Sequence, residues 1–146
     1  MCYPTNMKLI FEPSAPDLIH FGWEHGRFLD YWSAIHFLTG SLLGIAAIVI
    51  GLTPWTTLLC VAGTATLYEV LEVMLQVSED AENVLSDIIL TTLGAVIAQY
   101  SIVNMVSTFT QIIWVFIGIM FADIFLLSLG WKHYLKKKLS SVQTKR

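Results

Sequence analysis

The chain has 146 residues and a mass of 16.4 kDa, which is enough for one domain. Hydrophobic residues make up 55% of it and charged residues only 13%, about half the share found in soluble domains. This composition and the net charge of −3 exclude a disordered chain and a nucleic-acid-binding protein, and they argue against an ordinary soluble enzyme. Two cysteines, Cys2 and Cys60, are too few for a disulfide framework.

Residues 1–30 precede the apolar part of the chain. Pro13 and Pro16 interrupt this segment, and no apolar core of a secretory signal peptide follows a basic start. Aromatic and charged side chains alternate over residues 18–31, a pattern that predicts an interfacial helix on the membrane surface. His20 and His25 would lie on different faces of such a helix, so we interpret them as solvated rather than metal-binding.

Two long stretches, residues 31–68 and 88–122, contain no Asp, Glu, Lys or Arg. Each is long enough for most of two membrane spans of about 20 residues. Pro54 divides the first stretch, and polar residues around Ser107 divide the second. The predicted fold is all-α and polytopic, an N-terminal interfacial segment followed by four transmembrane helices at about residues 31–53, 56–77, 84–103 and 109–130.

All eight Lys and Arg residues precede the first predicted span or follow the last one. Four spans put both chain ends on one side, and the enrichment of basic residues in cytoplasmic segments predicts that this side is the cytoplasm. The chain then divides into a cytoplasmic or interfacial segment (1–30), a transmembrane domain (31–131) and a basic cytoplasmic tail (132–146). The tail is expected to set the topology, and it could also bind anionic lipid.

Five ionisable side chains interrupt the apolar spans. They are His36, Glu69, Glu72, Asp87 and Asp123. At 1.5 Å per residue, all five fall in the cytoplasmic half of the predicted spans. Because a charged side chain near mid-membrane costs roughly 2.5–3.5 kcal/mol, we expect them to face one another in an acidic cavity that opens to the cytoplasm.

Polar and small residues recur at helical spacing beside these groups. The expected inward faces are Ser33, His36, Gly40 and Gly44 in the first span, Thr66, Glu69, Glu72 and Gln76 in the second, and Asn83, Asp87, Thr91, Gly94 and Ala98 in the third. Small residues at this spacing allow transmembrane helices to approach closely. No polar face runs through Asp123, so a structural role is favoured there.

Carboxylates gathered around one imidazole suit proton exchange, or the binding of a cation or a polar headgroup. His36, Glu69, Glu72 and Asp87 could also hold a divalent metal, and a metal-bound water would then make a hydrolase or transferase. The sequence contains no HExxH, CxxC, nucleophile elbow or phosphate loop. No catalytic residue and no cofactor other than such a metal is therefore predicted, and a structural role for each group stays open.

Three motifs accompany these residues: an HF pair with a nearby glycine (residues 36–40), YEVLE (68–72) and SDIILTTLGA (86–95). Over about residues 30–100 the chain resembles the small VanZ-like and YjdF-like bacterial membrane proteins. In those families a His-Phe pair, a Glu-containing helix and an Asp-xxx-Asn-Thr-x-Gly-Ala helix recur around a core of four or five spans.

The positions that match this family pattern are His36, Glu69, Asp87, Thr92, Gly94 and Ala95. Thr91 stands where VanZ-like proteins usually have Asn, and residues 78–83 contain no counterpart of their loop arginine. VanZ-like proteins are associated with envelope phenotypes and glycopeptide resistance. The resemblance therefore implies the bacterial inner membrane and an envelope-related role, but no particular reaction.

The leading hypothesis is a small integral membrane protein that binds or moves a lipid headgroup, a small amine or a proton in its acidic cavity. Two alternatives stay open: an accessory subunit of a larger membrane complex, and a metal-assisted hydrolase or transferase. The expected partners are the lipid bilayer and, for a subunit, another membrane protein or a second copy of this chain.

Overall fold

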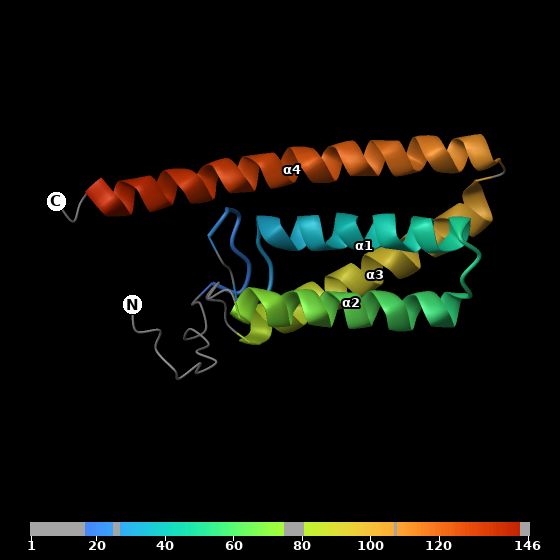
Figure 1. The fold of residues 1–146 in the computed structure, drawn as a ribbon, viewed down its shortest axis with the longest axis horizontal. Coiled ribbons are helices and arrows are strands. Elements are labelled where there is room, and N and C mark those ends of the chain that lie inside the picture. The colour runs from blue at the N-terminus through green and yellow to red at the C-terminus, as the bar shows by residue number, and fades with distance from the viewer. Residues whose placement is uncertain (1–16, 25–26, 75–80, 107, 144–146) are drawn as a thin grey trace, which may run out of the picture.

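The computed structural model describes residues 17–24, 27–74, 81–106 and 108–143, with side chains as far as residue 136 (Figure 1). These residues form four helices: α1 (Tyr31–Val49), α2 (Pro54–Met74), α3 (Ala81–Met105) and α4 (Phe109–Gln143). All four are long and apolar enough to cross a membrane. The protein is thus an all-α membrane protein with four spans, which confirms the fold class predicted from composition.

The helix ends follow local backbone chemistry and differ from the predicted boundaries. α1 ends at Val49 rather than at residue 53, because Gly51 adopts a positive φ of 78° directly after the C-cap. α2 begins at Pro54, where the missing N–H costs nothing in a first turn. α4 continues to Gln143 rather than ending near residue 130, since Leu and Lys favour the helix beyond the apolar part.

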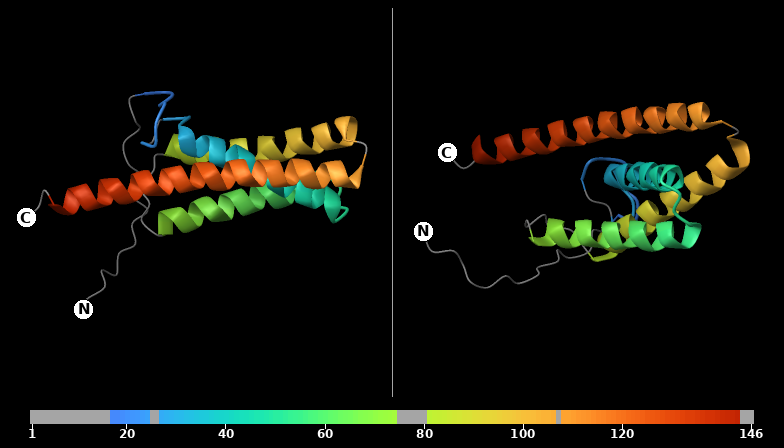
Figure 2. Two further views of the ribbon diagram at one scale, coloured as in Figure 1. Left: turned by 90° about the horizontal axis from the view of Figure 1, so that it is seen from above. Right: turned by 45° about the vertical axis from the view of Figure 1, so that its right-hand side comes forward.

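α1 occupies the centre of the bundle, with α4 on one side and α2 and α3 on the other (Figures 1 and 2). Its closest neighbour is α3, because glycines bring the two backbones together. A methyl group on Gly44 would lie 2.6 Å from the Ala95 carbonyl oxygen, and methyl groups on Gly40 or Gly94 would also collide with the facing backbone. The small residues thus allow the close approach of two helices that their spacing predicted.

A small apolar core closes the end of the bundle away from Asp30. Ile45, Ala98 and Ile102 are buried there, and partly buried side chains of α4, including Phe116, pack against them. Most other large apolar side chains of α4, such as Trp114 and Phe125, are exposed. Apolar exposure of this kind is what a lipid-facing helix requires.

The described part of residues 17–30 is a loop rather than the predicted interfacial helix, so that prediction is wrong. A parallel bridge joins Ile19 to Leu29 and closes the loop. Asp30 has extended backbone angles and caps α1 by accepting from the amides of Trp32 and Ser33. A capping Asp must lie outside the helix, and so the chain cannot enter α1 as a continuous helix.

Two side chains, Arg27 and Trp23, fix this loop against the spans at the Asp30 end of the bundle, where α1 and α3 begin and α2 ends (Figure 1). Arg27 forms a 3.0 Å ion pair with Glu82 in the first turn of α3. The ring of Trp23 packs edge-on against Trp32 and lies over Gly130 of α4, where a side chain would collide with both indoles. The loop is therefore anchored to three of the four helices.

Candidate functional site

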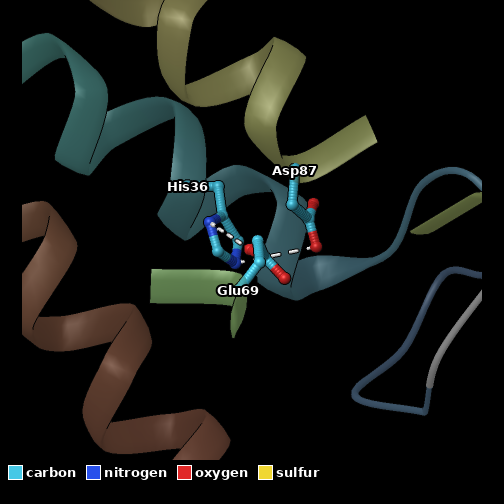
Figure 3. Close-up of side chains that lie close together, drawn as sticks. All are labelled: His36, Glu69 and Asp87. Atoms are coloured by element: carbon cyan, nitrogen blue, oxygen red, sulfur yellow. Dashed lines mark ion pairs between the residues drawn. The ribbon is translucent and has the colours of Figure 1, made fainter. Parts of the chain in front are cut away.

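Three ionisable side chains from three different helices meet near the Asp30 end of the bundle. His36 projects from α1, Glu69 from α2 and Asp87 from α3, and the three point toward one another (Figure 3). His36 Nδ1 lies 3.8 Å from Glu69 Oε1, and His36 Nε2 lies 3.6 Å from Asp87 Oδ2. One ligand atom from each side chain falls within 4.8 Å of the other two. We call these three residues the His–Glu–Asp cluster.

The depth of the cluster follows from where its helices begin and end. His36 lies five residues after the start of α1, Glu69 five before the end of α2, and Asp87 six after the start of α3. At 1.5 Å per residue, each group lies about 8–9 Å from the same end of its helix. Glu69 and Asp87 are 3% and 1% exposed, while His36 is 16% exposed and forms the accessible side of the cluster.

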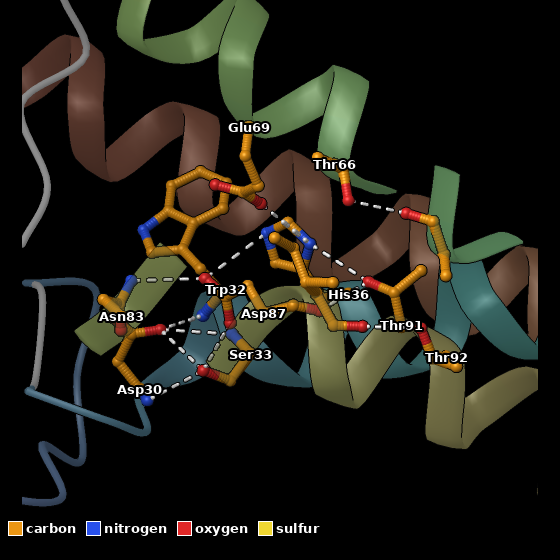
Figure 4. A network of polar contacts seen from close by, with 12 residues as sticks. Asp30, Trp32, Ser33, His36, Thr66, Glu69, Asn83, Asp87, Thr91 and Thr92 are labelled. Carbon is orange, nitrogen blue, oxygen red and sulfur yellow. Dashed lines mark hydrogen bonds and ion pairs between the residues drawn. The ribbon is translucent and has the colours of Figure 1, made fainter. Parts of the chain in front are cut away.

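Asp87 is held in place by hydrogen bonds to both carboxylate oxygens (Figure 4). Ser33 Oγ donates to Oδ1 at 3.0 Å, and Asn83 Nδ2 donates to Oδ2 at 3.2 Å. Ser33 Oγ also accepts the backbone N–H of Asp30, at 3.3 Å, as part of the α1 capping box. The N-cap of α1 is therefore linked through Ser33 to the cluster.

The imidazole of His36 contacts an aromatic ring and a hydroxyl group besides the two carboxylates. Tyr68 packs edge-on against the ring, with the centroids 5.8 Å apart. Thr91 Oγ1 lies 3.5 Å from His36 Nδ1, and the same hydroxyl donates at 2.7 Å to the backbone carbonyl of Asp87. Thr91 thus connects the histidine to the helix turn that carries the aspartate.

The structure brings together three of the five predicted site residues. Glu72 is half-buried one turn after Glu69 and is not a member of the cluster. Asp123 is buried between α4 and α1, where its Oδ2 accepts from Thr39 at 3.3 Å. Its other oxygen, Oδ1, has no hydrogen-bond partner among the described residues. Asp123 therefore belongs to the packing of α4 on α1 and not to the cluster.

Two of the three predicted inward faces are confirmed. In α3 every member is buried, and in α1 only His36 is partly exposed. In α2 the prediction is confirmed at Glu69 and wrong at Thr66, because the buried residues are Thr57, Val61, Ala65 and Glu69. Thr66 is exposed, since its hydroxyl is satisfied within its own helix by the Ala62 carbonyl. Gln76 lies outside the described residues.

Two supporting interactions were not predicted. Asp30 and Ser33 form a capping box that aims Ser33 at Asp87, and the Asp-x-x-Ser spacing was the signal for it. Gln99 Nε2 donates to Thr57 Oγ1 at 2.8 Å and ties α3 to the buried face of α2. Nothing in the sequence pairs these last two residues, which are 42 positions apart.

Neither the family models, nor the curated proteins, nor the solved structures that were compared with this chain include a match. The geometry of the His–Glu–Asp cluster is therefore the main indication of what the protein binds.

Proposed function

We propose that this protein binds a small cation within the membrane, between α1, α2 and α3. The observation that carries the proposal is the convergence of one imidazole and two buried carboxylates, with one ligand atom from each within 4.8 Å of the others. Negative charge this far from bulk water is costly, and a bound cation offsets that cost. Three separate helices supply the ligands, so binding would also tie the spans together.

The proposal includes an orientation. We infer that both chain ends are cytoplasmic, because Arg27, before α1, and Lys132 and Lys136, in the last part of α4, lie at the end of the bundle that carries the cluster. A cation would then enter from the cytoplasm on the side of His36, the most exposed of the three ligands. The basic residues after α4 leaves the apolar region would lie beside anionic headgroups.

We also propose a bacterial inner membrane and an envelope-related role. These follow only from the resemblance to VanZ-like and YjdF-like proteins. In favour of that resemblance, two of its matched positions, His36 and Asp87, face each other across 3.6 Å, and Glu69 completes the same cluster. A gene deletion tested for sensitivity to cell-wall antibiotics would decide it; unchanged sensitivity would remove the envelope proposal without affecting cation binding.

The test of cation binding compares two neighbouring glutamates of α2. Glu69→Gln removes a charge inside the cluster, whereas Glu72→Gln removes one charge a single turn away and serves as the matched control. Thermal unfolding of the detergent-purified protein is followed with sodium, potassium, methylammonium, magnesium, calcium, manganese and zinc salts. A cation at 100 times its Kd stabilises the folded state by about 2.7 kcal/mol, which is seen as a higher Tm.

We expect at least one cation to raise the Tm of the wild-type protein and of Glu72→Gln but not that of Glu69→Gln. If no cation in this set changes the wild-type Tm, or if both variants respond alike, the proposed site is wrong.

A further inference from the structure

We propose that the cation held by the His–Glu–Asp cluster is a divalent transition-metal ion, of the kind represented by Zn²⁺ and Mn²⁺. This inference rests on the proposed function and narrows it to one class of ligand. Two observations carry it: the chemistry of the donor set, and the way neighbouring residues orient His36 and Asp87.

The donor set combines nitrogen and oxygen. Mg²⁺ and Ca²⁺ prefer the oxygen ligands of carboxylates, carbonyls and water to an imidazole nitrogen. Zn²⁺, Mn²⁺ and Fe²⁺ accept imidazole together with carboxylate. A cluster selective for alkali ions or for an organic ammonium would need oxygen or aromatic ligands in place of His36. One imidazole with two carboxylates is therefore a transition-metal donor set.

The spacing of the ligand atoms is compatible with a single ion. Zinc–ligand bonds to His and carboxylate are about 2.0–2.2 Å, so two ligand atoms on one ion lie at most about 4.4 Å apart. His36 Nε2 lies 3.6 Å from Asp87 Oδ2, while Glu69 Oε1 lies 3.8 Å from the other ring nitrogen, Nδ1. One ligand atom from each of the three side chains lies within 4.8 Å of the other two. Side-chain shifts of under about 1 Å would bring all three within bonding distance.

The hydrogen bonds around His36 favour a ligand at Nε2. The Thr91 hydroxyl donates its proton to the Asp87 carbonyl. Toward His36 Nδ1 the same oxygen can therefore act only as a hydrogen-bond acceptor. This contact fits the tautomer with a proton on Nδ1, which leaves a lone pair on Nε2. That lone pair faces Asp87 Oδ2 at 3.6 Å, an arrangement of two acceptors that a cation between them stabilises.

Asp87 has the outer hydrogen bonds that metal-binding carboxylates usually have. Ser33 and Asn83 each donate to one of its oxygens, from α1 and from the first turn of α3. Such outer partners fix the orientation of a ligating side chain and strengthen metal binding.

The number of protein ligands indicates what kind of metal site this is. Structural zinc sites are closed by four protein ligands, whereas sites that exchange a ligand or react with one keep a position open. Among the residues that the structure describes, the cluster supplies three ligands, and its accessible side is at His36. The bound ion would therefore exchange with solvent or contact a further molecule, rather than act only as a cross-link between helices.

The test uses the full chain, purified in detergent and stripped of metal with a chelator. Calorimetric titrations with Zn²⁺, Mn²⁺, Mg²⁺ and Ca²⁺, and metal analysis after dialysis, measure affinity and stoichiometry. We expect one Zn²⁺ or Mn²⁺ per chain, with Mg²⁺ and Ca²⁺ at least about tenfold weaker. His36→Gln is expected to weaken binding by more than about 100-fold, while His133→Gln, at an exposed position of α4, changes nothing.

A second measurement does not depend on any variant folding. In the Mn²⁺-loaded wild-type protein, pulsed electron paramagnetic resonance detects a nitrogen nucleus bound to the metal. We expect the signal of one imidazole nitrogen, and its absence would overturn the inference.

The outcomes separate the two proposals. If magnesium, calcium or a monovalent cation binds at Glu69 as tightly as zinc does, and His36→Gln has no effect, the transition-metal inference fails while cation binding stands. If no cation binds at all, both proposals fail. If metal binds but His133→Gln abolishes it and His36→Gln does not, the site lies elsewhere and the inference is again wrong.

Discussion

Ser33 of α1 donates a 3.0 Å hydrogen bond to Asp87 of α3, and both side chains are buried. The bond joins the capped first turn of one span to the carboxylate of another. It also uses a hydroxyl whose oxygen already accepts from the backbone of Asp30. The orientation of Asp87 therefore depends on how α1 begins.

Removal of this hydroxyl is expected to weaken metal binding without removing a ligand. Ser33→Ala should lower the affinity for Zn²⁺ or Mn²⁺ by about 10- to 100-fold, the range seen when outer-shell partners of metal ligands are lost. Calorimetric titration provides the measurement. Ser128→Ala is the control, because that exposed serine bonds only to its own helix in α4. Equal affinities in the two variants would contradict the role given to Ser33.

The contact between α1 and α3 is expected to tolerate no side chain at Gly40. Gly40→Ala places a methyl group against the backbone of Thr91, so the helices must separate. We expect a loss of about 1–3 kcal/mol in the free energy of unfolding, as for other overpacked sites. Gly63→Ala is the control, because nothing lies within 4 Å of the new methyl group. Unfolding in mixed detergent micelles measures both, and equal stability of the two variants would contradict this packing.

The orientation can be tested with fusions at two positions. Green fluorescent protein placed after Arg146 is expected to fluoresce, because the fusion would stay in the cytoplasm. Alkaline phosphatase inserted at Gly51, in the turn between α1 and α2, is expected to be active outside. The physical reason is that all eight basic residues of the sequence either precede residue 31 or follow residue 131, and basic residues are enriched on the cytoplasmic side. The reverse pattern would put the His–Glu–Asp cluster near the outer surface.

Asp123 is expected to be dispensable for metal binding. Asp123→Asn keeps an acceptor for Thr39, and the carboxylate is not among the three ligands. The affinity for metal should therefore change less than the tenfold expected on losing even an outer-shell partner. Calorimetric titration with Zn²⁺ or Mn²⁺ measures this affinity. A larger loss would mean that α4 contributes to the site.

The sequence predicted the architecture well because the membrane constrains it strongly. Stretches without charge fix the number of spans. Polar side chains at helical spacing face the other helices, because exposure to lipid is costly for them. For this reason every predicted inward residue of α3, from Asn83 to Ala98, is buried. The meeting of His36, Glu69 and Asp87 follows from the same constraint combined with the count of residues from the helix ends.

The errors arose where local interactions compete with that constraint. Thr66 satisfies its hydroxyl within α2, so it could be exposed, and the buried face of α2 turned out to run through Thr57 and Ala65. Asp123 accepts a hydrogen bond from Thr39, and no periodic pattern in the sequence predicts this pair. The alternation of aromatic and charged side chains before α1 predicted a helix, but Asp30 caps α1 from an extended conformation, so α1 begins only after it.

The most direct test of the central claim is an anomalous-scattering map from crystals of the protein grown with Zn²⁺. The account predicts a single strong peak between His36, Glu69 and Asp87, bonded to one imidazole nitrogen and two carboxylate oxygens at about 2.0–2.2 Å. A structure in which these side chains keep their present positions, while no peak appears between them at saturating zinc, would contradict it.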